Sequence, residues 1–249
     1  MEKISVIKFG GSLAKNIAAR NKFLRELASY RRNAQCVLVH GGGPEINLWL
    51  EKSGIKPKFA NGLRFTDART LEVVEMVLSG KVNKDIVASL SSLGVKAVGI
   101  SSKDGKTVLC KRVAKLGYVG EPVKTDKTLV EILIKSGYLP VVSPIGIDSK
   151  HNTLNVNADS VAMALSIALK ADELVYLTDV PGVLNEKKCT IPVIRLGETA
   201  KLVKKGIVSG GMIPKLNGCE GAVKKGVKKV WIIDGSKGLA NKKGTVVTK

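Results

Sequence analysis

The sequence predicts an α/β fold, a three-layer α/β/α sandwich with a mainly parallel central sheet. Short apolar segments rich in β-branched residues alternate with longer segments of helical period, which is the pattern of successive β-α-β units. Several of the short segments are apolar throughout, as expected where helices cover both faces of a parallel sheet. With 249 residues, 44% hydrophobic and 25% charged, the chain can bury a full core as one domain or two lobes.

Seven β-strands are expected along the chain. Each is a short apolar run that ends near a glycine or a polar residue. They cover Ile4–Lys8, Cys36–His40, Lys96–Ile100, Leu139–Pro144, Glu173–Thr178, Lys229–Ile233 and Gly244–Val247.

Seven helices are expected between these strands, and the third is the longest. It begins with Thr66 or Asp67 as a natural N-cap, and Gly80 is expected to bend or divide it. The helices cover Ile17–Arg32, Pro44–Ser53, Asp67–Leu93, Thr128–Ser136, Asp159–Leu169, Glu198–Lys204 and Met212–Lys225. Two polar segments, Lys56–Thr66 and Ser102–Thr125, interrupt the alternation with glycines, which predicts hairpins that act as flaps over a site.

The chain is strongly basic, with a formal net charge of +20 from 41 Lys and Arg against 21 Asp and Glu. A field of this sign attracts nucleic acids, acidic membranes, acidic proteins and phosphorylated small molecules alike. Aromatic residues make up only 4%, which argues against stacking platforms for single-stranded nucleic acid. The last quarter, Lys187–Lys249, holds 15 Lys and Arg against 3 Asp and Glu, mostly as pairs typical of solvated helix faces. Salt screens such a field over about 8 Å, so it can gather anions but cannot replace fixed cations.

The four cysteines, Cys36, Cys110, Cys189 and Cys219, are widely separated, so neither a zinc site nor a disulfide framework is expected. No apolar run reaches membrane-spanning length, and the N-terminus lacks the pattern of a leader. We therefore expect a cytoplasmic protein with no membrane partner and no metal held by its own side chains.

Three glycine clusters stand where a predicted strand passes into a helix, the edge at which open parallel sheets bind ligands. They are Gly10-Gly11, Gly41-Gly42-Gly43 and Gly210-Gly211. Glycine lets backbone amides approach an anion, and a following helix N-terminus adds a favourable dipole. Each cluster alone is more often a tight turn. The common nucleotide fingerprints are absent, because Ile100 stands where a Walker A motif ending in Gly105-Lys106-Thr107 needs glycine.

Six segments in order, spread over nearly the whole chain, resemble the motifs of the N-acetylglutamate kinase family in the amino acid kinase superfamily. They are Lys8-Phe9-Gly10-Gly11-Ser12, His40-Gly41-Gly42-Gly43-Pro44, Asn61-Gly62-Leu63-Arg64-Phe65-Thr66, Glu72–Lys84, Asn155-Val156-Asn157-Ala158-Asp159 and Ser209–Lys215. The resemblance implies ATP-dependent phosphorylation of the γ-carboxylate of N-acetyl-L-glutamate in arginine biosynthesis, with ATP and Mg²⁺ as cofactors. It also implies one domain over residues 1–249, with an acyl-substrate and dimerisation lobe at about 1–170 and a nucleotide lobe at about 171–249.

In this resemblance Lys8 and Lys215 are the catalytic cations, and Asp159 holds both ammonium groups in position. By propensity alone, an Asp in that place is at least as readily a helix N-cap. The chemistry agrees with the residues, because a carboxylate is already ionised at neutral pH and needs no general base, and the chain has only two histidines. His40, at the end of an apolar strand, is interpreted as a packed residue satisfied by the backbone.

The resemblance also assigns the two binding regions. Gly42 and Gly43 would donate amides to the acyl substrate, Arg64 would clamp its α-carboxylate, and Asn155, with Asn157 as the weaker candidate, would contact it. The alternative to this binding role is that Arg64 is a solvated arginine on a hairpin. The nucleotide side comprises Gly10, Gly11, Asp179, Val180, Pro181, Gly182, Val183, Leu184, Ile207, Val208, Ser209, Gly210 and Gly211. On sequence alone, Val180–Val183 is equally a β-turn.

Partners follow from the same comparison. One helical stretch carries apolar residues at helical spacing, which usually marks a core face: Leu71, Val74, Val77 and Leu78. In the family that the chain resembles, this region helps build the dimer, so a homodimer is expected. One rival hypothesis is a kinase for glutamate or aminoadipate attached to an acidic amino-group carrier protein, which would suit a basic surface. A basic nucleic-acid-binding or regulatory protein with a kinase-like fold is the less favoured third hypothesis, and no nucleic-acid partner is expected.

Overall fold

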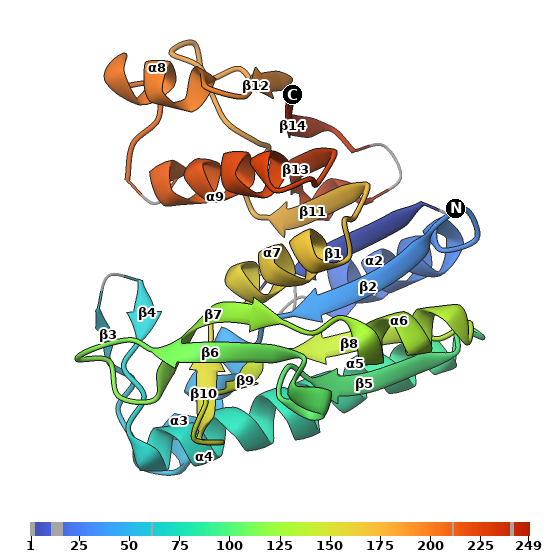
Figure 1. Cartoon of the computed structure of the whole chain (residues 1–249), viewed down its shortest axis with the longest axis vertical. Helices are drawn as coiled ribbons and strands as arrows, with labels where there is room; N and C mark the ends of the chain where they lie inside the picture. Colours follow the sequence, from blue (N-terminus) through green and yellow to red (C-terminus); the bar gives the residue numbers. More distant parts are fainter. Residues whose placement is uncertain (1–2, 11–16, 61, 211, 240–241) are drawn as a thin grey trace.

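The computed structural model describes residues 3–10, 17–60, 62–210, 212–239 and 242–249. Its centre is a sheet with helices on both faces (Figure 1), as the sequence predicts, but the sheet has eight strands because Val193–Arg195 was not among the expected seven. The strand order is β12-β14-β13-β11-β1-β2-β8-β5, and neighbours are parallel except that β14 runs antiparallel to β13. The strands are β1 Ile4–Phe9, β2 Gln35–His40, β5 Ala97–Ser101, β8 Leu139–Ser143, β11 Glu173–Thr178, β12 Val193–Arg195, β13 Lys229–Asp234 and β14 Gly244–Thr248.

Alternate side chains of the central strands feed two hydrophobic clusters, one on each face. Val6 of β1 joins the cluster covered by α6, α7 and α9, whereas its neighbour Ile7 joins the cluster covered by α2 and α5. The helices are α2 Ile17–Tyr30, α3 Gly43–Lys52, α4 Ala68–Glu75, α5 Asn83–Ser91, α6 Thr128–Lys135, α7 Ala158–Ala168, α8 Glu198–Lys204 and α9 Met212–Lys224. The predicted sandwich is confirmed, and the ends of the expected strands and helices differ from the observed ones by at most two residues.

The long third helix is divided, as Gly80 led us to expect. Asp67 is its N-cap, because the Asp67 carboxylate accepts the amide of Thr70 at 2.8 Å. Between α4 and α5 the chain forms a π-helical segment, Met76–Val82, that includes Gly80. π-helical turns are rare and often lie at functional sites. Two short 3₁₀ turns, Asp104–Lys106 and Gly235–Lys237, complete the helical elements.

A second, smaller sheet lies beside α4 and carries much of the polar segment that the sequence left outside the main sheet. Strands β6 Val108–Arg112, β7 Val119–Thr125, β9 Ile145–Ile147 and β10 Thr153–Val156 close on one another. The expected hairpin within Ser102–Thr125 is present as β6 and β7, but it is not a flap. It pairs with β9 and β10, contributed by residues far along the chain, which no local pattern can indicate.

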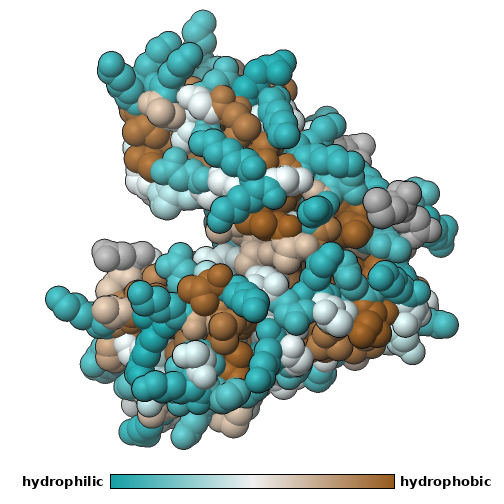
Figure 2. All heavy atoms as spheres, viewed as in Figure 1, coloured by the Kyte–Doolittle hydropathy of each residue, from teal (hydrophilic) through white to brown (hydrophobic). Residues whose placement is uncertain are grey.

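The expected hairpin within Lys56–Thr66 is present as β3 Phe59–Ala60 and β4 Leu63–Arg64. In Figure 1 the parts of the chain after β11, coloured orange to red, lie on one side of the central strands and the small sheet lies on the other. The surface is hollowed between them (Figure 2). In the described residues no helix combines the length and the apolar character that a membrane crossing requires.

Candidate active site

The candidate site lies at the carboxyl ends of β1, β2 and β11, the edge at which parallel sheets bind ligands. Lys8 stands near the end of β1, which pairs with β2 on one side and with β11 on the other. Its ammonium nitrogen lies 2.8 Å from Asp159 Oδ1, and its side chain is 14% exposed. The end of the strand therefore delivers a largely buried cation directly to the start of α7.

Asp159 connects two cations that are far apart in the sequence. Lys215, in the first turn of α9, places its ammonium nitrogen 3.6 Å from Asp159 Oδ2. Burial by itself would raise the pKa of Asp159, but the charges of Lys8 and Lys215 outweigh it and lower this pKa. Because two ammonium groups face one ionised carboxylate, the group has an excess positive charge and attracts an anion.

Tyr176 forms the floor beneath this group, a role that the sequence analysis did not assign. Its hydroxyl donates to the backbone oxygen of Asp159 at 3.3 Å, and Lys215 Nζ lies 5.7 Å from the centre of its ring. The side chain is buried, and burial raises the pKa of its phenol well above the ordinary value. Tyr176 thus stays neutral and orients both partners. No sequence motif indicated this role, which follows from the pairing of Tyr176 with Lys8 in the β1–β11 register.

Asn157, rather than Asp159, caps α7. Asn157 Oδ1 accepts the backbone amide of Asp159 at 2.7 Å, so Asp159 is the second residue of the helix. The N-cap reading of Asp159 that propensity left open is therefore wrong. The carboxylate is free for the lysines, and the adjacent helix N-terminus favours its negative charge.

A cavity of about 180 Å³ reaches the start of α7, where Asn157 and Ala158, directly before Asp159, line it. The predicted acyl-substrate residues Gly42, Gly43, Arg64, Asn155 and Asn157 all line it. Gly42 and Gly43 begin α3 with Pro44 in the first turn, so the cavity meets a helix N-terminus without side chains. A Cβ on Gly42 would lie 2.6 Å from Leu78 Cδ2 of the π-helical segment, so a side chain at this position would require Leu78 to move.

Arg64 is a buried cation for which no acidic partner is present in the described part of the chain. It is 9% exposed, and its Nη2 donates to Asn47 Oδ1 at 2.6 Å. Its Nη1 is buried without a hydrogen-bond partner among the described residues, and burial lowers its pKa. The guanidinium lies over the ring of Phe59, 4.7 Å from its centre. Because a buried charge needs an opposite charge, this side chain is better explained by a bound anion than by a solvated hairpin.

Asn155 faces the same cavity from β10. Its side-chain nitrogen donates to the buried hydroxyl of Thr66 at 3.0 Å, and Thr66 donates in turn to the Arg64 backbone oxygen at 2.9 Å. This chain of bonds connects the small sheet to the β3–β4 hairpin. Asn47 and Phe59, which hold Arg64, were missed by the sequence analysis because neither belongs to a recognisable motif.

The predicted nucleotide residues extend from the same sheet edge. Phe9 pairs with Leu177, and a Cβ on Gly10 would lie 2.9 Å from Leu177 O, so Gly10 packs closely against the strand that leads to Asp179–Leu184. Gly182 has φ +137°, and the amide of Val183 donates to Thr245 Oγ1 at 2.8 Å. Val183 and Val208 are buried in one core cluster, so only their backbones are available to a ligand. Gly11 and Gly211 lie outside the described residues.

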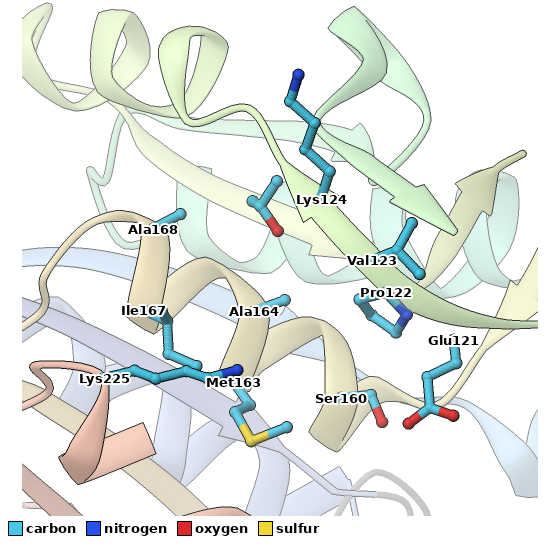
Figure 3. Close-up of a pocket in the computed structure, with 11 residues that line it drawn as sticks. Glu121, Pro122, Val123, Lys124, Ser160, Met163, Ala164, Ile167, Ala168 and Lys225 are labelled. Atoms are coloured by element: carbon cyan, nitrogen blue, oxygen red, sulfur yellow. The ribbon is translucent and has the colours of Figure 1, made fainter. Parts of the chain in front are cut away.

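A larger hollow of about 320 Å³ lies elsewhere, between β7 and α7. Figure 3 shows Met163, Ala164 and Ile167 of α7 on one wall and Pro122 and Val123 of β7 opposite. None of the predicted site residues is among those lining it, so this hollow is separate from the candidate anion site. Among the residues that the structure describes, no three His, Cys, Asp or Glu side chains gather as a metal site would require.

Comparison with known proteins adds independent findings. Residues 3–234 match the amino acid kinase family. An acetylglutamate kinase from Endomicrobium trichonymphae is 51% identical over 249 residues, covering all of both chains. Another, from Kosmotoga olearia, is 46% identical over 237 residues, covering 94% of this chain and 84% of that one.

Solved structures show the same fold. A protein from Streptococcus mutans superposes with a TM-score of 0.86 at 30% identity, covering 100% of this chain and 99% of that one. The carbamate kinase of Giardia lamblia bound to AMP-PNP superposes with a TM-score of 0.73 at 19% identity, with the same coverage. At that identity the likeness concerns the fold alone.

Proposed function

The chain belongs to the amino acid kinase family, and on that premise we propose that it phosphorylates the γ-carboxylate of N-acetyl-L-glutamate with ATP. The product is N-acetyl-L-glutamyl 5-phosphate, and the reaction is the second step of arginine biosynthesis. The observation that carries the proposal is that Lys8, Asp159 and Lys215 meet near a cavity lined by the buried Arg64, whose Nη1 has no hydrogen-bond partner among the described residues. Identity of 51% to an acetylglutamate kinase over the full length supports the choice of acyl substrate.

The reaction needs charge stabilisation rather than proton transfer. The γ-carboxylate is already ionised at neutral pH, and one of its oxygens attacks the γ-phosphorus while the bond to the leaving ADP oxygen breaks. Lys8 and Lys215 stabilise the negative charge that spreads over the transferring phosphoryl group. Asp159 holds both ammonium groups in place before the substrates arrive, so little reorganisation is needed during the transfer.

The acyl substrate would be oriented by the cavity. Arg64 offers the unpaired Nη1 to the α-carboxylate, and the amides of Gly42 and Gly43 face the γ-carboxylate. Asn155 and Asn157 contact the N-acetyl side of the ligand. A ligand carboxylate on Arg64 would offset the cost of burying this charge.

ATP would lie along the segments Asp179–Leu184 and Ile207–Gly211, with Gly10 and Gly11 close to its phosphates. Mg²⁺ would be carried in by the phosphate oxygens, because the Asp159 carboxylate is already engaged by two lysines. When bound, the ion neutralises phosphate charge. We place the acyl substrate in a lobe of about residues 1–170 and the nucleotide in a lobe of about 171–249.

We also propose a homodimer in the cytoplasm. Val74, Val77 and Leu78 of the apolar stripe pack inside the chain, so the stripe itself forms core. Met76, in the same segment, is 64% exposed and Trp49 of the adjacent α3 is 39% exposed, which leaves apolar surface for a second copy. The basic surface would also suit an acidic protein partner.

One assay tests the proposed function. Purified protein with ATP and Mg²⁺ is expected to form a hydroxylamine-trappable acyl phosphate from free N-acetyl-L-glutamate, and the Lys8→Ala variant is expected to form almost none. Product from glutamate or aminoadipate on a carrier protein, with none from the free compound, would favour the carrier-dependent kinase. Steeply salt-dependent DNA binding without ATP turnover would favour the basic binding protein.

A further inference from the structure

His40 is fully buried at the end of β2, directly before the glycine loop. Its Nδ1 lies 2.9 Å from the backbone oxygen of Gly41. Its Nε2 lies 3.1 Å from the side-chain nitrogen of Asn83, the first residue of α5 after the π-helical segment. Both ring nitrogens therefore have a partner inside the protein, and neither takes part in the chemistry proposed above.

The surroundings of Asn83 determine how its amide is oriented. Its nitrogen also donates to the backbone oxygen of Val141 at 2.9 Å, whereas its oxygen accepts from Lys84 Nζ at 3.2 Å. Gly99 makes room for it, since a Cβ there would lie 1.9 Å from Asn83 Oδ1. The side chain is fully buried, so these contacts leave it one arrangement.

This arrangement selects the tautomer of His40. An amide nitrogen only donates, so Nε2 of His40 must accept, and a backbone oxygen only accepts, so Nδ1 must carry the proton. The ring is therefore neutral. Burial lowers the pKa of His40 to about 4; the charge of Lys84 also lowers it, and the bond to Gly41 raises it. The ring therefore stays neutral at physiological pH.

The bond to Gly41 O acts on a backbone amide that lines the cavity. The peptide between Gly41 and Gly42 is trans, so its oxygen and its N–H point in opposite directions in one plane. Holding the oxygen toward His40 directs the Gly42 N–H away from His40. Among the described residues this N–H has no acceptor, and Gly42 lines the cavity. The Gly41 amide is fixed too, because it donates to Phe9 O at 3.0 Å next to Lys8.

We propose that His40 is a positioning residue, which Asn83 holds in the Nδ1–H tautomer so that the Gly41–Gly42 peptide presents its N–H to the acyl substrate. Leu78 packs against this peptide from the π-helical segment, and a Cβ on Gly42 would lie 2.6 Å from its Cδ2. The π-helical segment and the residue after it thus support the loop through Leu78 and Asn83. The inference rests on the proposed function only in naming the acyl substrate.

Three substitutions separate the two bonds of His40. The amide of His40→Asn can place a donor where Nδ1 lies, that of His40→Gln can place an acceptor where Nε2 lies, and His40→Leu provides neither. We expect Gln and Leu to raise the KM for N-acetyl-L-glutamate about tenfold, the effect of one misdirected neutral hydrogen bond, with the KM for ATP unchanged. The Asn variant should stay close to the wild-type KM even if its melting temperature falls. If the KM rises in all three variants in parallel with a fall in melting temperature, the histidine is merely structural.

The tautomer can be measured without any turnover. In ¹⁵N-labelled His151→Asn protein, His40 is the remaining histidine, and Asn suits the left-handed backbone of position 151. We expect ¹⁵N shifts of a protonated Nδ1 and an unprotonated Nε2 from pH 5.5 to pH 8.5, and Asn83→Leu should mix the tautomers. A protonated Nε2, or an imidazolium in that range, would overturn the proposal. If the wild type fails to phosphorylate N-acetyl-L-glutamate while these shifts appear as expected, the assigned substrate is wrong but the tautomer lock stands.

Discussion

Asn157 and Asp159 divide two tasks at the start of α7. The side chain of Asn157 accepts the amide of Asp159 at 2.7 Å and so caps the helix. The carboxylate of Asp159 turns instead to Lys8 at 2.8 Å and to Lys215 at 3.6 Å. The helix start is therefore stabilised by a neutral side chain, and the charged one is left to arrange the cations.

Asp159→Asn should lower kcat by about 100-fold or more. A neutral amide cannot hold the two ammonium groups in the positions where they stabilise the transition state. Folding should change little, since the cap belongs to Asn157. Steady-state kinetics and a thermal melt measure both effects. Asp85→Asn, which removes an ion pair with Lys81 on the surface, serves as the matched control. A normal kcat in Asp159→Asn would refute the role of the carboxylate.

Lys8→Ala and Lys215→Ala should each reduce kcat by about 100- to 1,000-fold, as expected when a preorganised electrostatic contact is lost. Affinity for ATP, measured by calorimetry, should change far less, because the proposed nucleotide contacts come mostly from the backbone of other segments. Lys204→Ala, at an exposed helix position, should behave as wild type. Near-normal turnover in either of the first two variants would contradict the two-cation mechanism.

Arg64→Met should raise the KM for the acyl substrate by about 10- to 100-fold, through loss of a charge-assisted contact with its carboxylate. Thermal stability should not fall, because burial of an incompletely paired guanidinium is unfavourable in the ligand-free protein. Arg112, which lies over Tyr118 as Arg64 lies over Phe59 but is exposed, provides the control Arg112→Met. A fall in melting temperature with an unchanged KM would assign Arg64 a structural role.

Glu173 should contribute stability that depends on pH. Burial would raise its pKa, but contacts with Lys242, Lys3 and Tyr30 outweigh it and lower this pKa. Such a carboxylate stabilises the fold above its unfolded pKa of about 4.3, and this stability is lost as the pH falls through the lower folded value. Glu173→Gln should therefore lower the free energy of unfolding at pH 7 by about 2 kcal/mol, the scale of a charge-assisted bond. Urea titrations should give a smaller difference from wild type at pH 3.5 than at pH 7.

The thiols should differ sharply in reactivity. Cys36, Cys110 and Cys219 are buried, and burial raises the pKa of each to about 12, whereas Cys189 is exposed. A thiol-specific disulfide reagent at pH 8 should modify one cysteine per folded chain and four after denaturation, because only thiolate that meets solvent reacts. Rapid modification of a second thiol in the folded protein would contradict the described packing.

The main sheet and its helices were predictable because their signal is local. One strand is an uninterrupted apolar run that includes Leu174, Val175, Tyr176 and Leu177. Such a run indicates that both faces of the sheet are covered. The closed sheet was not predictable as a unit. Its strand β7 pairs with β10, a partner that follows after α6 and β8, and short strands of mixed polarity carry no signal for such a pairing.

The candidate site was also predictable only in part. Glycine clusters, Lys8, Arg64 and Lys215 could be singled out from motifs that resemble a known family. The motifs could not show that Arg64 stacks on Phe59 and bonds to Asn47, or that Tyr176 underlies Lys215. Packing around a residue depends on which elements fold against it, and a linear pattern does not contain those distances.

By itself the sequence determined the layered α/β fold, the edge at which ligands bind and the anionic class of those ligands, since each follows from local periodicity, glycine placement and charge. The tertiary structure alone decided that Asp159 serves the lysines instead of the helix end, and that His40 and Asn83 support the glycine loop. Propensity ranks Asp and Asn almost equally as caps, so the choice between residues 157 and 159 rests on where Lys8 and Lys215 bring their charges.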